Sequence, residues 1–145
     1  MLVADSMLGK LARYLRMLGH NVTYIPSDRD DSSIIEEYRD YIILTRDKML
    51  NGRASNSILI KSYMPIDQLR EVFPKLPPPE HRPWELCPFC STELERVPEK
   101  TDLPEYVSKI AKEIFVCRKC GRYYWKGTQS TNFAKMMEGI GIEIQ

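Results

Sequence analysis

Two pairs of cysteines constrain the fold of this chain more than any other feature of its sequence. Cys87 and Cys90 form one CxxC motif, and Cys117 and Cys120 form a second one, which is followed by Gly121. Each motif can wrap a turn around a metal ion with both sulfurs facing it, and two turns complete a tetrahedral site of four thiolates. Such a site selects zinc and leaves no open position for catalysis, so we predict a structural zinc ribbon.

A redox-active CxxC motif, or two disulfides, would use the same four cysteines. The location of the protein decides between these alternatives, because disulfides are rare in the cytoplasm. The apolar N-terminal run contains Asp5 and leads into an amphipathic helix, which is not the pattern of a signal peptide. No apolar stretch reaches the roughly 18 residues that a membrane span needs. We therefore expect a cytoplasmic protein that makes no membrane contact, in which the thiols bind metal.

The N-terminal half of the chain alternates short apolar runs with helical patterns. Strands are expected at 2–4, 22–25, 41–44 and 57–61, and helices at 8–18, 32–41, 49–56 and 66–76. This alternation predicts an α/β domain whose parallel sheet is flanked by helices. We place this domain at residues 1–76, a proline-rich linker at 77–84, and the zinc ribbon with a C-terminal helix at 85–145.

Acidic residues follow three of the expected strands. Asp5 directly follows the first strand and Asp47 the third, while Asp31 opens the helix after the second. The carboxyl ends of parallel strands meet at one edge of a sheet, where ligands bind. Carboxylate oxygens suit Mg²⁺ or Mn²⁺, and such an ion can activate water for phosphodiester hydrolysis. The alternative is that these acids only cap helices or occupy solvated turns.

Basic residues near these acids are candidates for phosphate contacts. Lys10, Arg13, Arg16 and His20 are expected on the face of the first helix opposite its leucines. The lysine and the two arginines could hold a phosphate backbone across the acidic site, or they could form an ordinary solvated face. Arg46 either contacts phosphate or keeps the neighbouring carboxylates ionised. Because the net charge is only +1, any nucleic-acid contact must come from such local patches.

A second basic and aromatic run follows the last cysteine. Tyr124, Trp125 and Lys126 form its centre, and the other members are Arg118, Lys119, Arg122 and Tyr123. Aromatic rings stack on unpaired bases while cations meet phosphates, so this run is a candidate RNA-binding surface. The alternative is that the rings pack the ribbon onto the α/β domain, with Trp125 the most buried of them.

Three motifs together resemble the Mut7-C family, a PIN-like ribonuclease domain followed by a zinc ribbon. They are VADSMLGKLARYLRMLG at 3–19, ILTRDK at 43–48, and the cysteine pairs with YWKG at 124–127. The resemblance covers essentially the whole chain and implies a PIN-like α/β fold, a divalent-metal site of clustered acids, and RNA as the substrate class. It matches Asp5, Asp31 and Asp47 to the family's acids, with Asp30 as the fallback for Asp31.

The sequence departs from the family pattern at two positions. Many PIN-like proteins carry another acid two residues after the TRD aspartate, where this chain has Met49. The family also tends to have a histidine shortly after YWKG, where this chain has Gln129. The first departure bears on the number of bound metal ions, and the second removes an acid–base or phosphate-binding group.

These features together predict a metal-dependent ribonuclease that uses one or two Mg²⁺ or Mn²⁺ ions, with the zinc ribbon aiding RNA binding. A non-catalytic RNA- or ribosome-binding adaptor with a vestigial acidic site is the alternative. A receiver-like or phosphatase domain with Asp5 or Asp47 as nucleophile fits less well, because the zinc ribbon suits such a domain poorly. The sequence does not say which RNA is cut, or whether cleavage is endonucleolytic or exonucleolytic. It also leaves open the oligomeric state and the existence of an inhibitory protein partner.

Overall fold

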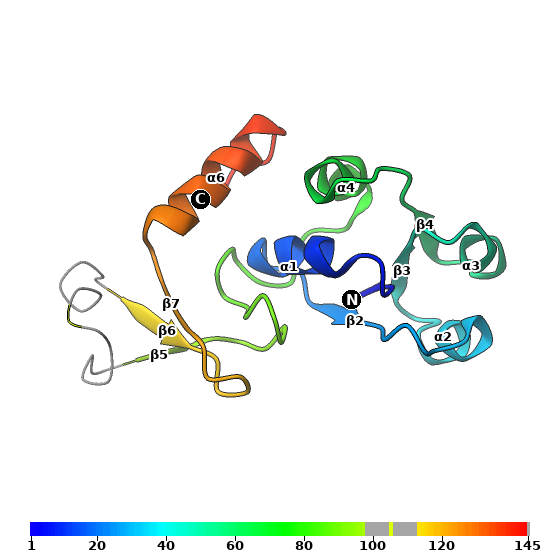
Figure 1. Ribbon diagram of the computed structural model, residues 1–145, viewed down its shortest axis with the longest axis horizontal. Coiled ribbons are helices and arrows are strands. Elements are labelled where there is room, and N and C mark those ends of the chain that lie inside the picture. Colours follow the sequence, from blue (N-terminus) through cyan, green and yellow to red (C-terminus); the bar gives the residue numbers. More distant parts are fainter. Residues whose placement is uncertain (98–104, 106–112, 145) are drawn as a thin grey trace. The chain divides into compact units, whose positions relative to one another are not determined.

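The computed structural model describes residues 1–97, 105 and 113–144 (Figure 1). The chain forms two compact units, Met1–Ser91 and Thr92–Gln145. Within the described part of the chain, no helix has both the length and the apolar character that crossing a membrane requires.

The first unit is built on a four-stranded parallel sheet with the strand order β2-β1-β3-β4. Its strands are β1 (Leu2–Ala4), β2 (Val22–Tyr24), β3 (Ile42–Thr45) and β4 (Ser57–Leu59). Every residue of β1 is buried, and Ala4 is in register with Tyr24 on one side and Leu44 on the other. The predicted α/β class and parallel sheet are confirmed, whereas the PIN-like assignment stays a prediction.

Helices cover both faces of this sheet, with α1 and α4 on one face and α2 and α3 on the other (Figure 1). Their bounds are α1 (Gly9–Met17), α2 (Asp31–Glu37), α3 (Lys48–Arg53) and α4 (Pro65–Val72), and a 3₁₀ turn, η1 (Phe73–Lys75), follows α4. Alternate residues of a strand point to opposite faces. Val3 and Ile43 accordingly join one buried cluster with Ile34 of α2 and Leu50 of α3.

The proline-rich segment at 77–84 is bound to the end of α1. His81 N donates to the carbonyl oxygen of Gly19 over 3.0 Å, and Trp84 N donates to that of Met17 over 3.0 Å. Gly19 has φ +100°, and a Cβ atom there would lie 2.1 Å from the His81 carbonyl oxygen. Only glycine meets both conditions, because it tolerates positive φ and leaves room for the close backbone approach.

Two residues expected on the polar face of the first helix are buried. Arg16 is 6% exposed and His20 is 1% exposed, so the prediction of a continuous basic face there is wrong. The reason is that segment 77–91 folds back on α1, so the helix is covered on more than the side that its leucines indicate. The ring of His20 packs edge-on against Phe73, and burial holds the pKa of His20 below its usual value, although the charge of Glu80 opposes this.

The second unit contains an antiparallel sheet with the strand order β5-β6-β7 and a helix after it. Its elements are β5 (Glu95–Arg96), β6 (Ile114–Val116), β7 (Tyr123–Trp125) and α6 (Thr128–Gly139). Ile114 is fully buried and packs with Val97 and Trp125. The C-terminal helix is present as predicted, while parts of the predicted ribbon, at 98–104 and 106–112, lie outside the described residues.

Candidate functional site

Asp5 is the most firmly held of the three predicted acids. It leaves β1 beside the end of β3, and it is 8% exposed. Its Oδ1 atom accepts a hydrogen bond from Met7 N over 3.0 Å, and its Oδ2 atom accepts from Arg46 N over 3.2 Å and from the Thr45 hydroxyl. Because β2 and β3 lie on opposite sides of β1, this is the switch point at which open α/β sheets bind ligands.

Asp47 lies close to Asp5 because Thr45 connects the two residues. The Thr45 hydroxyl donates to Asp5 and accepts a hydrogen bond from Asp47 N over 3.0 Å. The Asp47 side chain caps α3, since its Oδ1 atom accepts from Met49 N over 2.8 Å and from Leu50 N over 3.4 Å. Its Oδ2 atom has no hydrogen-bond partner among the residues that the structure describes. The structure therefore links the Asp5 carboxylate to the backbone of Asp47, and one Asp47 carboxylate oxygen has no partner within the described part of the chain.

Asp31 has a different environment from the other two acids. It lies in the first turn of α2, where its Oδ2 atom is 3.8 Å from Arg53 Nη1. The cap of α2 is Asp30, whose Oδ1 atom accepts from Ser33 N over 2.7 Å, so Asp31 is not needed as a cap. Neither of its carboxylate oxygens contacts Asp5 or Asp47 in the described part of the chain. The proposed third ligand is thus held in an ion pair with Arg53.

The predicted phosphate contacts on the first helix range from exposed to buried. Lys10 lies at the surface near the Tyr14 ring, and the Arg13 guanidinium lies 5.4 Å from the Phe89 ring centre. Arg16 instead points inward and donates to the carbonyl oxygens of Val22 and Pro88 over 2.7–3.0 Å. Burial lowers its pKa, and the nearby Cys87 and Cys90 oppose this effect. The guanidinium expected to hold RNA is therefore occupied by backbone carbonyls.

The four cysteines lie close enough together to hold a metal ion such as zinc. Their Sγ atoms all lie within 4.8 Å of one another, and none of the cysteines forms a disulfide. A tetrahedral site with Zn–S bonds of about 2.3 Å needs sulfurs about 3.8 Å apart, which this arrangement approaches. Among the described residues, this is the one group of three or more candidate ligands at such short range, and the three aspartates do not form another.

Both CxxC motifs are closed by the same backbone hydrogen bond. Ser91 N donates to the Cys87 carbonyl oxygen over 2.8 Å, and Gly121 N donates to that of Cys117 over 2.7 Å. The donor residues both have positive φ, +60° at Ser91 and +79° at Gly121. Glycine at position 121 favours this turn, whereas serine at position 91 does not indicate it, because serine rarely adopts positive φ. Each motif thus closes into the tight turn that directs two sulfurs at one point.

The electrostatics of the second motif favour the thiolate form. Burial raises the pKa of Cys117, but hydrogen bonds from Thr92 and from the backbone of Cys120 and Lys119 outweigh it and lower the pKa to about 6. The Thr92 hydroxyl lies 3.2 Å from Cys117 Sγ. A thiolate is the form of cysteine that binds metal, so this environment suits a metal ligand.

The aromatic run of the second unit is divided between the two faces of its sheet. Trp125 is partly buried against Ile114, while Tyr124 pairs with Phe115 on the opposite face. Tyr123 is 39% exposed and Lys126 is exposed. The tryptophan therefore contributes to the core of this unit, and the roles of Tyr124, Trp125 and Lys126 in RNA binding stay predictions.

Comparison with known proteins gives one finding. A family model described as Mut7-C RNAse domain matches residues 1–137 of the chain. None of the curated proteins and none of the solved structures matches it.

Proposed function

The chain belongs to the Mut7-C RNAse domain family, and we propose that it is a metal-dependent ribonuclease that hydrolyses RNA phosphodiester bonds. The family description implies a nuclease that acts on RNA. The observation that carries the proposal is the connection of Asp5 to Asp47 through Thr45 at the switch point of the sheet. This is the edge at which ligands of open α/β folds bind.

The donor set at this edge fits a hard divalent cation. Asp5 and Asp47 supply carboxylate oxygens, and Mg²⁺ or Mn²⁺ binds to proteins through one or two such groups while keeping several waters. When bound, the ion would activate water and neutralise the charge that develops on the phosphate. Thr45 fixes the orientation of Asp5, and Asp31 would complete the site by leaving its ion pair with Arg53. That ion pair is partly exposed, so breaking it costs little free energy.

The positions of the basic residues support RNA as the substrate. We assign phosphate contacts to the exposed Lys10, the half-buried Arg13 and Arg46 beside the acids, but not to the buried Arg16. In the second unit, we propose that Tyr124, Trp125 and Lys126 extend the RNA-binding surface and that zinc on the four cysteines supports its fold.

The test is the substitution Asp47→Asn. Asparagine caps a helix about as well as aspartate, so α3 keeps its cap while the ligand loses its charge. We expect this variant to lose Mn²⁺-dependent cleavage of a labelled oligoribonucleotide and to bind it as the parent does. Asp28→Asn is the matched control, because Asp28 lies in an exposed turn. This variant should cleave at the parental rate. An Asp47→Asn variant that cuts as fast as the parent would refute the site.

One observation favours a second candidate function, a non-catalytic RNA- or ribosome-binding adaptor. Met49 is 73% exposed two residues after Asp47, at the position where many PIN-like proteins carry a further acid. A site with fewer acids could bind RNA without cutting it. RNA affinity in the parent, combined with no turnover at any Mn²⁺ concentration, would favour the adaptor over the ribonuclease.

A further inference from the structure

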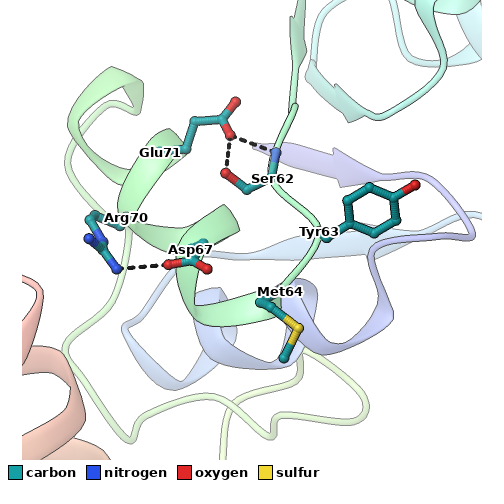
Figure 2. Close-up of a pocket in the computed structure, with 6 residues that line it drawn as sticks. All are labelled: Ser62, Tyr63, Met64, Asp67, Arg70 and Glu71. Carbon is teal, nitrogen blue, oxygen red and sulfur yellow. Dashed lines mark hydrogen bonds and ion pairs between the residues drawn. The ribbon is translucent and has the colours of Figure 1, made fainter.

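Tyr63 is the most exposed large apolar side chain in the described residues, at 82%. It lies between β4 and α4, after the carboxyl end of β4, and therefore at the same edge of the sheet as Asp5 and Asp47. Figure 2 shows its ring projecting away from Arg70 and Glu71 of α4. The ring is therefore accessible to a ligand that binds at this edge of the sheet.

The loop that carries Tyr63 is held in place by hydrogen bonds between its backbone and two side chains of α4. The Glu71 carboxylate accepts hydrogen bonds from Lys61 N over 2.9 Å and from Ser62 N over 3.0 Å, and Gln68 Nε2 donates to the Tyr63 carbonyl oxygen over 3.3 Å. Burial raises the pKa of Glu71, but these hydrogen bonds outweigh it and lower the pKa below its usual value. The ring is thus presented from an ordered backbone.

Arg46 connects the Tyr63 ring to the acidic site. Its guanidinium lies 4.4 Å from the ring centre, and its Nη2 atom donates to the Lys61 carbonyl oxygen over 3.4 Å. The backbone N–H of the same residue donates to Asp5 Oδ2 over 3.2 Å. One residue therefore spans the distance between the candidate catalytic carboxylate and the exposed ring.

We propose that Tyr63 is a stacking platform for one unpaired RNA base and that Arg46 contacts the neighbouring phosphate. Together these two contacts would position the RNA strand across Asp5 and Asp47. An exposed ring beside a fixed cation is the combination that binds unpaired bases and their phosphates. A pocket of about 450 Å³ adjoins the loop and is lined by Ser62, Tyr63, Met64, Asp67, Arg70 and Glu71 (Figure 2). Because the ring projects away from Arg70 and Glu71, the exposed face of the ring and not this pocket would receive the base. This inference rests on the proposed function and makes single-stranded RNA the preferred substrate.

The experiment measures RNA affinity by fluorescence anisotropy, in the full chain that also carries Asp47→Asn so that no cleavage interferes. The probes are a labelled single-stranded oligoribonucleotide of mixed sequence and a blunt duplex of the same length. We expect Tyr63→Ala to weaken single-strand binding about 10-fold and Tyr63→Phe to change it by less than about twofold, because stacking needs the ring and not the hydroxyl. Affinity for the duplex, whose bases are already stacked, should not change.

Met64→Ala is the matched control, since Met64 is 61% exposed at the next position but has no ring. It should bind the single strand as the parent does. An equal loss with Met64→Ala, an equal loss on the duplex, an unchanged affinity with Tyr63→Ala, or a parent that binds neither probe would each overturn the platform. The binding test is independent of cleavage. If single strands bind through Tyr63 but the chain without Asp47→Asn never cuts them, the ribonuclease proposal is refuted and the platform is not.

Discussion

The four cysteines and the three aspartates are two candidate metal sites that this chain prepares in different ways. The cysteines come in two short motifs, each folded by its own turn, and their sulfurs already lie within 4.8 Å of one another. The aspartates come from three separate elements, and each is engaged by a protein group: Asp5 by Thr45 and Arg46, Asp47 by the start of α3, and Asp31 by Arg53.

This difference follows from what each ion does. A structural zinc site closes around its ion with four protein ligands, and here two local turns supply all of them. A catalytic magnesium site keeps waters and takes few protein ligands, so it depends on the topology of the sheet and on ligands that can move. We therefore expect loss of the first site to affect folding and loss of the second to affect activity. Four predictions test this contrast, in order of decreasing effect.

The largest effect is expected from the double substitution of Cys87 and Cys117 by serine. The parent should contain one zinc ion per chain, and the variant none, as measured by elemental analysis of the purified protein. Structural zinc contributes on the order of 10 kcal/mol to the folding of small metal domains, so the antiparallel sheet of the second unit should unfold in the variant. Circular dichroism on heating would show this. If the purified parent contains no zinc and is only as stable as the variant, the cysteines are not a structural metal site and the contrast between the two sites does not hold.

Asp5→Asn should affect both activity and stability. Loss of one metal-binding carboxylate costs several kcal/mol of transition-state stabilisation, so cleavage should fall by about 100-fold or more. The new amide group would also face donors that now bind the carboxylate, which should lower the free energy of unfolding by about 1–3 kcal/mol. Comparison with Asp47→Asn, which keeps its cap, separates the two effects. Full activity in the Asp5 variant would contradict the shared site.

Thr45→Val tests whether the hydroxyl aligns the two acids. It removes the donor to Asp5 and the acceptor for Asp47 N, at a residue that is fully buried. The free energy of unfolding should fall by about 1–3 kcal/mol, since buried polar partners lose their hydrogen bonds. We expect a moderate loss of cleavage as well, and Thr45→Ser should restore both by keeping the hydroxyl. Urea unfolding with parallel cleavage assays measures this.

The smallest effect is expected from Arg53→Ala. The ion pair with Asp31 is partly exposed and is worth at most about 1 kcal/mol. Freeing Asp31 to bind the cation should therefore lower the Mn²⁺ concentration that supports half-maximal cleavage, by up to about fivefold. Asp31→Asn should raise that concentration. If Arg53→Ala raises it instead, Asp31 does not belong to the metal site.

Much of the fold could be predicted from local patterns. The first strand and helix, the four parallel strands and the C-terminal helix lie close to their predicted positions, because strand and helix periodicities are properties of short segments. The predicted helix at 66–76 ends instead at Val72 and continues as the turn η1. Pro74 is the physical reason, since it has no N–H to continue the helical hydrogen bonds.

Properties that depend on tertiary contacts could not be predicted in the same way. The helical pattern placed Arg16 opposite the leucines, but it carries no information about segment 77–91, which supplies the second covering surface. Thr45 and Tyr63 also went unrecognised, because a hydroxyl or a ring after a strand has no distinctive spacing. Their significance comes from the neighbours that the sheet brings to them, Asp5 in one case and Arg46 in the other.

The backbone bonds between segment 77–84 and the end of α1 matter for anyone who wishes to trim this protein to a minimal fragment. The prolines look like the natural place to cut, and a cut at residue 76 would appear harmless from the sequence. It would remove the backbone N–H groups that donate to the carbonyl oxygens of Gly19 and Met17. It would also leave the buried guanidinium of Arg16 without its acceptor on Pro88. A fragment that keeps everything up to Ser91 retains these anchors, whereas the shorter one invites aggregation during purification.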